Sequence, residues 1–256
     1  MKKILIDDTF TTDVEVFLAS KKNIKMDSLR IAIMQPYFLP FIGYFQLVNA
    51  VDKFVIYDDV QFIRGWINRN YILLNGERHL INLLLTGASL NKTINNIELQ
   101  PNQRKLIKTI EYVYKKAPMF DEVFPVFLNI MEYEEKNLGK FLGNSITQIC
   151  KYLQVNTEFF FSSDINKNST LKGQNKILHI CKLLETSSYV NTIAGETLYN
   201  KDDFEKQNIE LKFLKSKTQG YPQFKNEFVP NLSILDVMMF NSIEEIRQML
   251  DNYELA

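Results

Sequence analysis

The chain has 256 residues, and its 30 Lys and Arg residues balance 30 Asp and Glu residues, so its formal charge is zero. This balance argues against a nucleic-acid-binding protein with a broad basic surface, although it leaves room for a local basic groove. Hydrophobic residues make up 46% and charged residues 23%, which excludes intrinsic disorder or a coiled coil as a description of the whole chain. The length suits one large domain or two small ones.

Cysteine and histidine are scarce. Cys150 and Cys181 both fall in helical patterns and form no CxxC pair, which fits a reducing compartment. His79 and His179 are too far apart in sequence to suggest a histidine-rich metal site or a set of catalytic histidines. No apolar run reaches the roughly 18 residues of a membrane span, and two acidic residues interrupt the N-terminal MKKILIDDTF. These features predict a cytoplasmic protein without a membrane span.

Regular patterning begins at Arg30, so residues 1–29 are predicted to be an N-terminal extension and residues 30–256 a single α/β domain. Residues 30–34 and 53–57 are short apolar strands, and residues 41–50 between them have helical spacing. Strand, helix and strand within thirty residues form a βαβ unit, whose strands run parallel with a right-handed crossover.

A hairpin and a series of helices and strands follow. Asn75-Gly76 lies between apolar runs in residues 71–85, which is a strong hairpin signal. Residues 121–153 form one long helix or two, because Pro125, Gly139 and Gly143 interrupt the pattern. Ser233 and Ser242 are candidate N-caps of the last two helices. The remaining predicted helices cover 103–116, 173–185, 202–207, 233–240 and 242–251, and the remaining strands cover 157–162, 188–192 and 209–214. The alternation favours an α/β domain with a mostly parallel sheet, a β-hairpin and a helical insertion at about 103–153.

The densest group of polar and aromatic residues lies in residues 35–69, after the first two strands. Ligands of open α/β sheets bind outside the carboxyl ends of the strands, so we expect a site here. Arginine side chains bind phosphate oxygens in pairs, and aromatic rings line the walls of a binding site. Gln35 and Asn68 would hydrogen-bond to polar groups of the ligand. A plainer interpretation is that Asp58 and Asp59 only end a strand and that Trp66 belongs to the core. The candidate substrate-binding residues of this group are Gln35, Tyr37, Tyr44, Arg64, Trp66, Asn68 and Arg69.

Asp58 and Asp59 are the candidate catalytic residues, with one of them as a general base that accepts a proton from an attacking amine. Either carboxylate is also a candidate to hold Mg²⁺ beside a ligand phosphate, since that ion needs only one or two carboxylates. Adjacent strand residues point to opposite faces, so at most one of the pair reaches the ligand. We assign no metal site.

Three further candidate substrate-binding residues lie downstream. Asn191 follows a strand and occupies another carboxyl end, and Tyr221 and Gln223 belong to a lid or contact loop, or to a turn set by the proline between them. Asp236 is either a buried polar contact or the partner of an arginine such as Arg69. His79 alternates with apolar residues, so we expect a partly buried structural side chain.

The stretch IAIMQPYFLPFIGYFQLVNAVDKFVIYDDVQFIRGWINRN resembles the signature of the WbqC-like family of bacterial proteins. The segments YVNTIAG from Tyr189, GYPQF from Gly220 and FVPNLSILD from Phe228 are also similar to it, and the resemblance covers about residues 30–250. Members are associated with O-antigen and other surface-polysaccharide gene clusters. The resemblance therefore implies a nucleotide-linked sugar, or another phosphorylated small molecule, as ligand. We expect transfer of an acyl or aminoacyl group from a donor onto a nucleotide-linked amino sugar.

A second resemblance concerns the segment PFIGYFQL from Pro40, which is similar to the first-helix region of HIGH-type nucleotidylyltransferases. Phe41 and Tyr44 stand where those enzymes carry the histidines that stabilise a triphosphate, and neither side chain carries a positive charge. The similarity implies a Rossmann-like layered α/β fold, not adenylyl transfer. Two alternatives to the transferase stay open: a non-catalytic nucleotide-sugar-binding protein of a glycan assembly complex, and a degenerate nucleotidylyltransferase.

Overall fold

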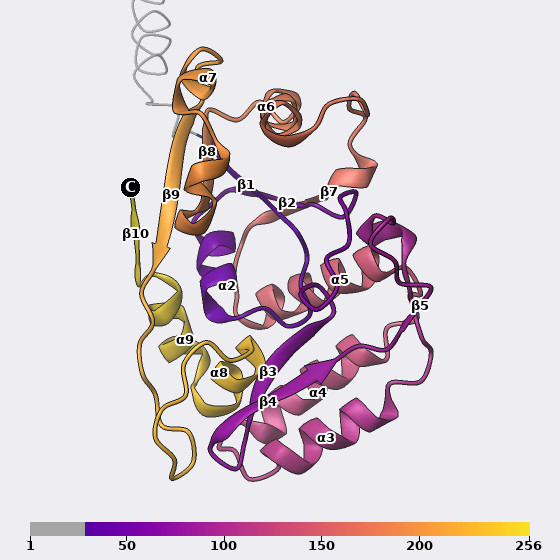
Figure 1. The fold of residues 1–256 in the computed structure, drawn as a ribbon. Helices are drawn as coiled ribbons and strands as arrows, with labels where there is room; N and C mark the ends of the chain where they lie inside the picture. The colour runs from indigo at the N-terminus through magenta and orange to yellow at the C-terminus, as the bar shows by residue number, and fades with distance from the viewer. Residues whose placement is uncertain (1–28) are drawn as a thin grey trace, which may run out of the picture.

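The computed structural model describes residues 29–256, so the predicted extension lies outside the described residues apart from its last residue. A six-stranded sheet lies at the centre of the described part (Figure 1). Five of its strands are mutually parallel, and β10 pairs antiparallel with β9 at one edge. The predicted α/β fold with a mostly parallel sheet is confirmed. The strands are β1 (Arg30–Met34), β2 (Lys53–Ile56), β7 (Glu158–Phe161), β8 (Ser188–Thr192), β9 (Glu210–Ser216) and β10 (Tyr253–Leu255).

The order of the strands across the sheet is β10-β9-β8-β1-β2-β7. From β1 the chain moves outward through β2 to β7, and it then returns to the other side of β1 to form β8 and β9. A doubly wound sheet opens a crevice at the carboxyl ends of the strands where this order reverses. The loops after β1, β2 and β8 therefore lie at the edge where a ligand is expected.

Helices cover both faces of the sheet, as Figure 1 shows for α2 and α5 on one side of the strands and α6 on the other. Ala32 and Phe54 belong to the core cluster on the α2 and α5 side, whereas Ile33 and Val55 belong to the cluster on the α6 side. Burial on both faces explains the nearly continuous apolar runs of these strands. The helices are α2 (Ile42–Asn49), α3 (Arg104–Tyr114), α4 (Phe120–Met131), α5 (Leu138–Tyr152), α6 (Gly173–Leu183), α7 (Lys201–Glu205), α8 (Ile234–Phe240) and α9 (Ile243–Leu250).

The segment 121–153 forms two helices, and its glycines are not the cause of the break. The chain leaves the helical conformation at about residues 132–137, and both Gly139 and Gly143 lie inside α5. A Cβ atom on Gly143 would lie 2.4 Å from the Phe161 ring. The glycine therefore allows α5 to pack closely against the end of β7.

The predicted hairpin is β3 (Arg69–Leu74) and β4 (Glu77–Asn82). Asn75 and Gly76 have φ angles of 53° and 80°, as the two central residues of a type I′ turn require. His79 is exposed on β4, so the expected partly buried histidine was wrong. It pairs with the buried Ile72 and shares a strand face with the buried Ile81, but residues 77–80 of β4 are all exposed and burial begins only at Ile81. Two short strands, β5 (Leu85–Thr86) and β6 (Glu98–Leu99), follow and were not predicted, because two residues carry no periodicity.

The C-terminal part is held by capped helices. Ser233 accepts a hydrogen bond from the backbone of Leu235, and Ser242 forms a capping box with Glu245, which confirms both predicted N-caps. β10 was not predicted, because three residues at a sheet edge have no distinctive pattern. Within residues 29–256, no helix combines the length and the apolar character that crossing a bilayer requires.

Candidate functional site

A cavity of about 480 Å³ is lined by the loop after β1, the segment after β2 and the hairpin. Three of the predicted substrate-binding residues, Tyr37, Trp66 and Arg69, come together in its wall. The loop after β1 flanks the crevice that the strand order predicts for a ligand, whereas the loop after β8, on the other side of that crevice, does not line this cavity. The other lining residues are Pro40, Phe41, Gly65, Asn70, Tyr71, Arg78 and Asn231.

Aromatic rings surround this cavity and are unusually accessible. Trp66 is 62% exposed, Phe41 41% and Tyr71 36%. The rings of Tyr37 and Trp66 meet edge to face with centroids 6.3 Å apart. Large apolar rings left in water around one hollow are typical of a binding site. Trp66 is therefore not a core residue, and the plainer interpretation of this position was wrong.

Two arginines complete the cavity. The guanidinium of Arg78 lies 4.3 Å from the centroid of the Tyr71 ring. Arg69 lies over Gly65, whose φ of +83° is costly for other residues and whose Cβ, if present, would be 2.4 Å from an Arg69 nitrogen. No carboxylate in residues 29–256 is within ion-pair distance of either guanidinium. Both are therefore available for the oxygens of an anionic ligand.

The walls of the cavity are held together by one hydrogen bond between backbone groups and one from a side chain to the backbone. The Phe38 amide donates to the Ile67 carbonyl at 2.8 Å, which joins the loop after β1 to the segment after β2. The Asn70 side chain donates to the Leu39 carbonyl at 2.5 Å. Leu39 has a φ of 44°, a left-handed conformation that this contact helps to hold. These bonds order the walls without a ligand, which lowers the cost of binding.

Gln35 and Tyr44 lie behind this cavity. Tyr37 donates to the Gln35 side-chain oxygen at 3.4 Å, and Tyr44 donates to the Gln35 carbonyl at 3.1 Å. Tyr44 is only 3% exposed and packs against Tyr37, so it supports the wall from within. Burial raises the pKa of Tyr44 well above its usual value.

Asp58 is fully buried at the end of β2. Its carboxylate accepts hydrogen bonds from the Ser163 amide at 2.9 Å and the Ser163 hydroxyl at 2.6 Å. Burial raises its pKa, and the bonds from Ser163 offset this only in part. Asp58 therefore joins β2 to the segment after β7.

Asp59 forms two ion pairs. Its carboxylate oxygens lie 2.9 Å from the Lys167 ammonium and 3.0 Å from the Lys176 ammonium, and these side chains are 6% and 11% exposed. The Lys176 ammonium also lies 4.7 Å from the centroid of the Tyr57 ring. Burial alone would raise the pKa of Asp59, but the ammonium groups of Lys167 and Lys176 and the nearby Ser162 outweigh it and hold the pKa below its usual value. Asp58 and Asp59 contact different partners, but they lie beyond β2, which ends at Ile56, so the alternation expected of strand residues does not apply to them. Neither lines the cavity.

We expect Asp59→Asn to lower the free energy of unfolding at neutral pH by about 2–4 kcal/mol, because it leaves two poorly exposed lysines without their carboxylate. A carboxyl whose pKa is lowered by folding contributes stability that is fully present above its unfolded pKa and is lost as pH falls through the folded value. Urea unfolding at a series of pH values should therefore show the difference from wild type shrinking below about pH 4.

Asp203→Asn is the matched control for this change. Asp203 pairs with Lys206 at 3.1 Å, and its pKa is lowered mainly by that lysine and by Gln174. This pair is exposed, so its loss should have little effect on unfolding. Equal effects of the two substitutions would contradict the role assigned to the Asp59 pairs.

Asn191 is buried at the end of β8, and its side chain is fully engaged within the chain. It donates to the Tyr199 hydroxyl at 2.9 Å and to the Tyr189 hydroxyl at 3.2 Å, and it accepts from the Thr192 amide at 2.7 Å. A Cβ on Gly195 would lie 3.1 Å from the same amide group. Asn191 therefore shapes the end of β8 and has no free hydrogen-bonding group for a ligand.

Tyr221 and Gln223 lie in a buried hydrogen-bond network around Asp236. Tyr221 donates to one Asp236 oxygen at 2.8 Å, Gln223 donates to the same oxygen at 2.7 Å, and Tyr114 donates to the other at 2.6 Å. Of the two roles expected for Asp236, the structure has the buried polar contact. Burial raises its pKa, and the bonds from Tyr114, Tyr221 and Gln223 oppose that rise.

The other candidates lie outside the cavity. Arg64 is exposed and does not line it, and the Asn68 side chain donates to the Leu83 carbonyl at 3.0 Å. Cys150 and Cys181 are both buried, as predicted, and burial raises the pKa of the Cys181 thiol to about 12. In the part of the chain that the structure describes, no three His, Cys, Asp or Glu side chains are placed to hold a metal ion.

Several residues of the site were not predicted. Tyr71 and Arg78 belong to the hairpin, and nothing in their spacing indicates that the hairpin closes the cavity. Lys167 and Lys176 lie more than 100 residues from Asp59, in segments whose composition resembles other exposed lysine-rich stretches. The sequence marks Phe41 only as the residue that stands where nucleotidylyltransferases carry a histidine, and not as part of a cavity wall.

Sheet order and cavity together define a doubly wound α/β protein with an aromatic, arginine-lined cavity at the carboxyl ends of its strands. The chain belongs to the WbqC-like protein family, whose model matches residues 35–248. It is 26% identical over 222 residues to Rv1507c, an uncharacterized protein of Mycobacterium tuberculosis, and the similarity covers 83% of this chain and 93% of that protein. No solved structure matches the chain significantly.

Proposed function

We propose that this protein is an enzyme of bacterial surface-glycan biosynthesis that transfers an acyl or aminoacyl group onto a nucleotide-linked amino sugar. The observation that carries the proposal is the cavity at the carboxyl ends of β1 and β2, with its four aromatic rings and two arginines that form no ion pair within residues 29–256. Flat rings stack on a base, and guanidinium groups bind phosphate oxygens in pairs. The pathway rests on membership of the WbqC-like family and on the gene clusters with which that family is associated.

In this proposal the base stacks on Trp66 or Tyr71, and the phosphates lie against Arg69 and Arg78. The amine of the sugar attacks the acyl carbonyl of the donor, the bond from that carbonyl to the leaving group breaks, and a general base accepts the proton that the amine loses. Asp59 is our candidate base; because it does not line the cavity, the sugar amine would have to extend beyond the cavity wall to reach it. The two lysines keep Asp59 ionised at neutral pH, and they also make it a weaker base than an ordinary carboxylate.

A non-catalytic nucleotide-sugar-binding protein is the second candidate function, and the contacts of the two aspartates favour it. Each Asp59 oxygen lies within 3.0 Å of a lysine ammonium, and Asp58 is fully buried. Neither carboxylate is free to take a proton unless the cluster rearranges. In that case the cavity binds the sugar nucleotide and delivers it to another protein.

The test is to incubate the purified protein with nucleotide-linked amino sugars and either acyl thioester or aminoacyl donors, with and without Mg²⁺, and to analyse the products by mass spectrometry. The transferase predicts a sugar product heavier by the acyl group. Binding without such a product, for every donor, would favour the second candidate. Failure to bind any nucleotide-linked sugar would contradict both, and ATP-dependent release of pyrophosphate would instead indicate a nucleotidylyltransferase.

A further inference from the structure

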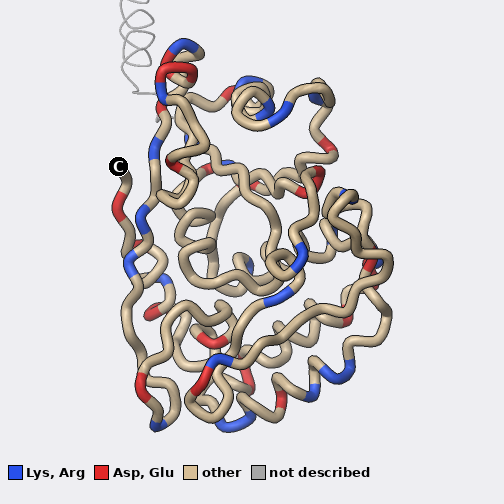
Figure 2. The backbone as a smooth tube through the Cα atoms, viewed as in Figure 1, with Lys and Arg blue, Asp and Glu red and all other residues tan. Residues whose placement is uncertain are grey.

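The exposed face of α3 and of the turn after it carries five basic side chains, Arg104, Lys105, Lys108, Lys115 and Lys116, which we call the α3 basic face. The opposite face of the helix is buried through Leu106, Ile110 and Tyr114. At 1.5 Å per residue the basic row extends over roughly 18 Å. Figure 2 shows it as a series of blue segments, interrupted by one red segment, at the margin of the molecule, far from α6 and α7 in Figure 1.

These five cations have no acidic partner among the described residues. No Asp or Glu of residues 29–256 lies within ion-pair distance of any of them, and α3 contains a single acidic residue, Glu111. Arg104 and Lys108 are one helical turn apart, where like charges destabilise a helix. A chain with zero net charge thus concentrates positive charge on one face, which favours an anionic partner.

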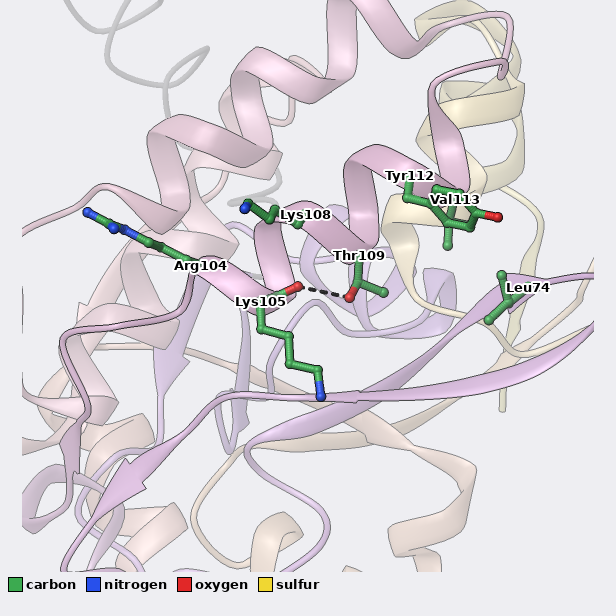
Figure 3. A pocket seen from close by; sticks show the side chains of 7 residues that line it. All are labelled: Leu74, Arg104, Lys105, Lys108, Thr109, Tyr112 and Val113. Atoms are coloured by element: carbon green, nitrogen blue, oxygen red, sulfur yellow. Dashed lines mark hydrogen bonds between the residues drawn. The ribbon is translucent and has the colours of Figure 1, made fainter.

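Beside this row lie two adjoining hollows of about 460 and 470 Å³, which share Leu74, Tyr112 and Val113 in their walls. Figure 3 shows the first, with Arg104 and Lys108 extending together from α3 and Lys105 extending in another direction. Tyr112 lies in the middle of the row and is 70% exposed. An apolar floor with a basic rim and a protruding tyrosine suits an amphiphile with an anionic head.

We propose that the α3 basic face docks on the surface of a bilayer that contains anionic phospholipids. The lysine and arginine heads would contact the lipid phosphates, Tyr112 would lie at headgroup level, and the hollow would take apolar lipid atoms. A nucleic acid is the less suitable partner, because its phosphate backbone offers nothing to the apolar floor. The inference does not depend on the proposed transferase activity, since no residue of the α3 basic face lines the aromatic cavity.

The test is co-sedimentation of the full chain with vesicles of phosphatidylcholine, with and without phosphatidylglycerol. We expect binding to the anionic vesicles alone, and weaker binding at high salt. Each basic side chain at an anionic surface contributes about fivefold in binding. Lys105→Gln with Lys108→Gln should therefore weaken binding by roughly 25-fold. The matched control, Lys182→Gln with Lys201→Gln, removes two exposed lysines from α6 and α7 and should bind like wild type.

Circular dichroism of each variant checks that it is folded. The proposal is overturned if the wild-type protein does not co-sediment with anionic vesicles, or if both double variants lose binding equally. It is also overturned if the protein binds a single-stranded oligonucleotide through the α3 basic face more tightly than it binds the vesicles. Tyr112→Ser gives a second test, because loss of binding with all five cations in place would show that the ring takes part.

Discussion

Arg69→Gln is expected to weaken the binding of a nucleotide-linked amino sugar by about 30- to 150-fold, or roughly 2–3 kcal/mol. The guanidinium lines the cavity and forms no ion pair with the described part of the chain. A bound phosphate would therefore receive charged hydrogen bonds that glutamine cannot replace, since its amide is neutral and lacks the planar fork. Isothermal titration with a nucleotide-linked amino sugar measures the effect directly.

Arg64→Gln is the matched control, because it removes the same charge from the same segment at an exposed position outside the cavity. It should bind like wild type. Gly65→Ala is a second probe: a Cβ there would displace the Arg69 guanidinium and would strain a backbone at φ +83°. It should weaken binding although the arginine is retained. If Arg64→Gln and Arg69→Gln had equal effects, binding would depend on general charge and the assigned cavity would be wrong.

The parallel strands and the location of the cavity were predictable because both depend on local patterns. Apolar runs of four or five residues, separated by a short helix, specify a βαβ unit, and a βαβ unit places Tyr37 and Trp66 at the same edge of the sheet. The turn at Asn75 was equally local, since two successive left-handed residues are needed there.

The other features depend on contacts between distant segments. Tyr114 and Asp236 are 122 residues apart, and neither position carries a sign of its partner. Tyr221 and Gln223 are polar, lie in a loop and precede a helix, so they matched the pattern of ligand contacts. Their hydrogen bonds are instead directed to a buried carboxylate, which hydrophobic periodicity cannot reveal.

That carboxylate connects three parts of the fold. Tyr114 belongs to α3, Asp236 to the first turn of α8, and Gln223 to the loop before it. The Tyr114 oxygen also accepts from the Leu73 amide at 3.2 Å, so its one proton is directed to Asp236. Gln223 extends the network by accepting from the Val229 amide at 2.7 Å. Within residues 29–256 the Tyr114 and Tyr221 hydroxyls donate to Asp236 alone, whereas the Gln223 amide also donates to the Val229 carbonyl at 3.2 Å and to the Tyr221 hydroxyl at 3.3 Å.

Asp236→Ala is expected to lower the free energy of unfolding by about 3–5 kcal/mol, because it leaves the Tyr114 and Tyr221 hydroxyls without their acceptor and removes the shortest hydrogen bond of the Gln223 amide. This is a large part of the roughly 5–15 kcal/mol that holds a typical domain together. Urea unfolding followed by circular dichroism measures it. Tyr221→Phe, which removes one donor and keeps the carboxylate, should cost only about 1 kcal/mol.

Asp121→Ala is the control that separates the contribution of the hydrogen-bond network to stability from that of a carboxylate in the first turn of a helix. Asp121 is in the first turn of α4, as Asp236 is in the first turn of α8, but it is exposed. Its loss removes only an interaction with the helix dipole, worth about 0.3–1 kcal/mol. If Asp236→Ala cost no more than Asp121→Ala, the network would contribute little to stability. Tyr221 and Gln223 would then be free to leave Asp236, and their original interpretation as ligand contacts would regain its basis.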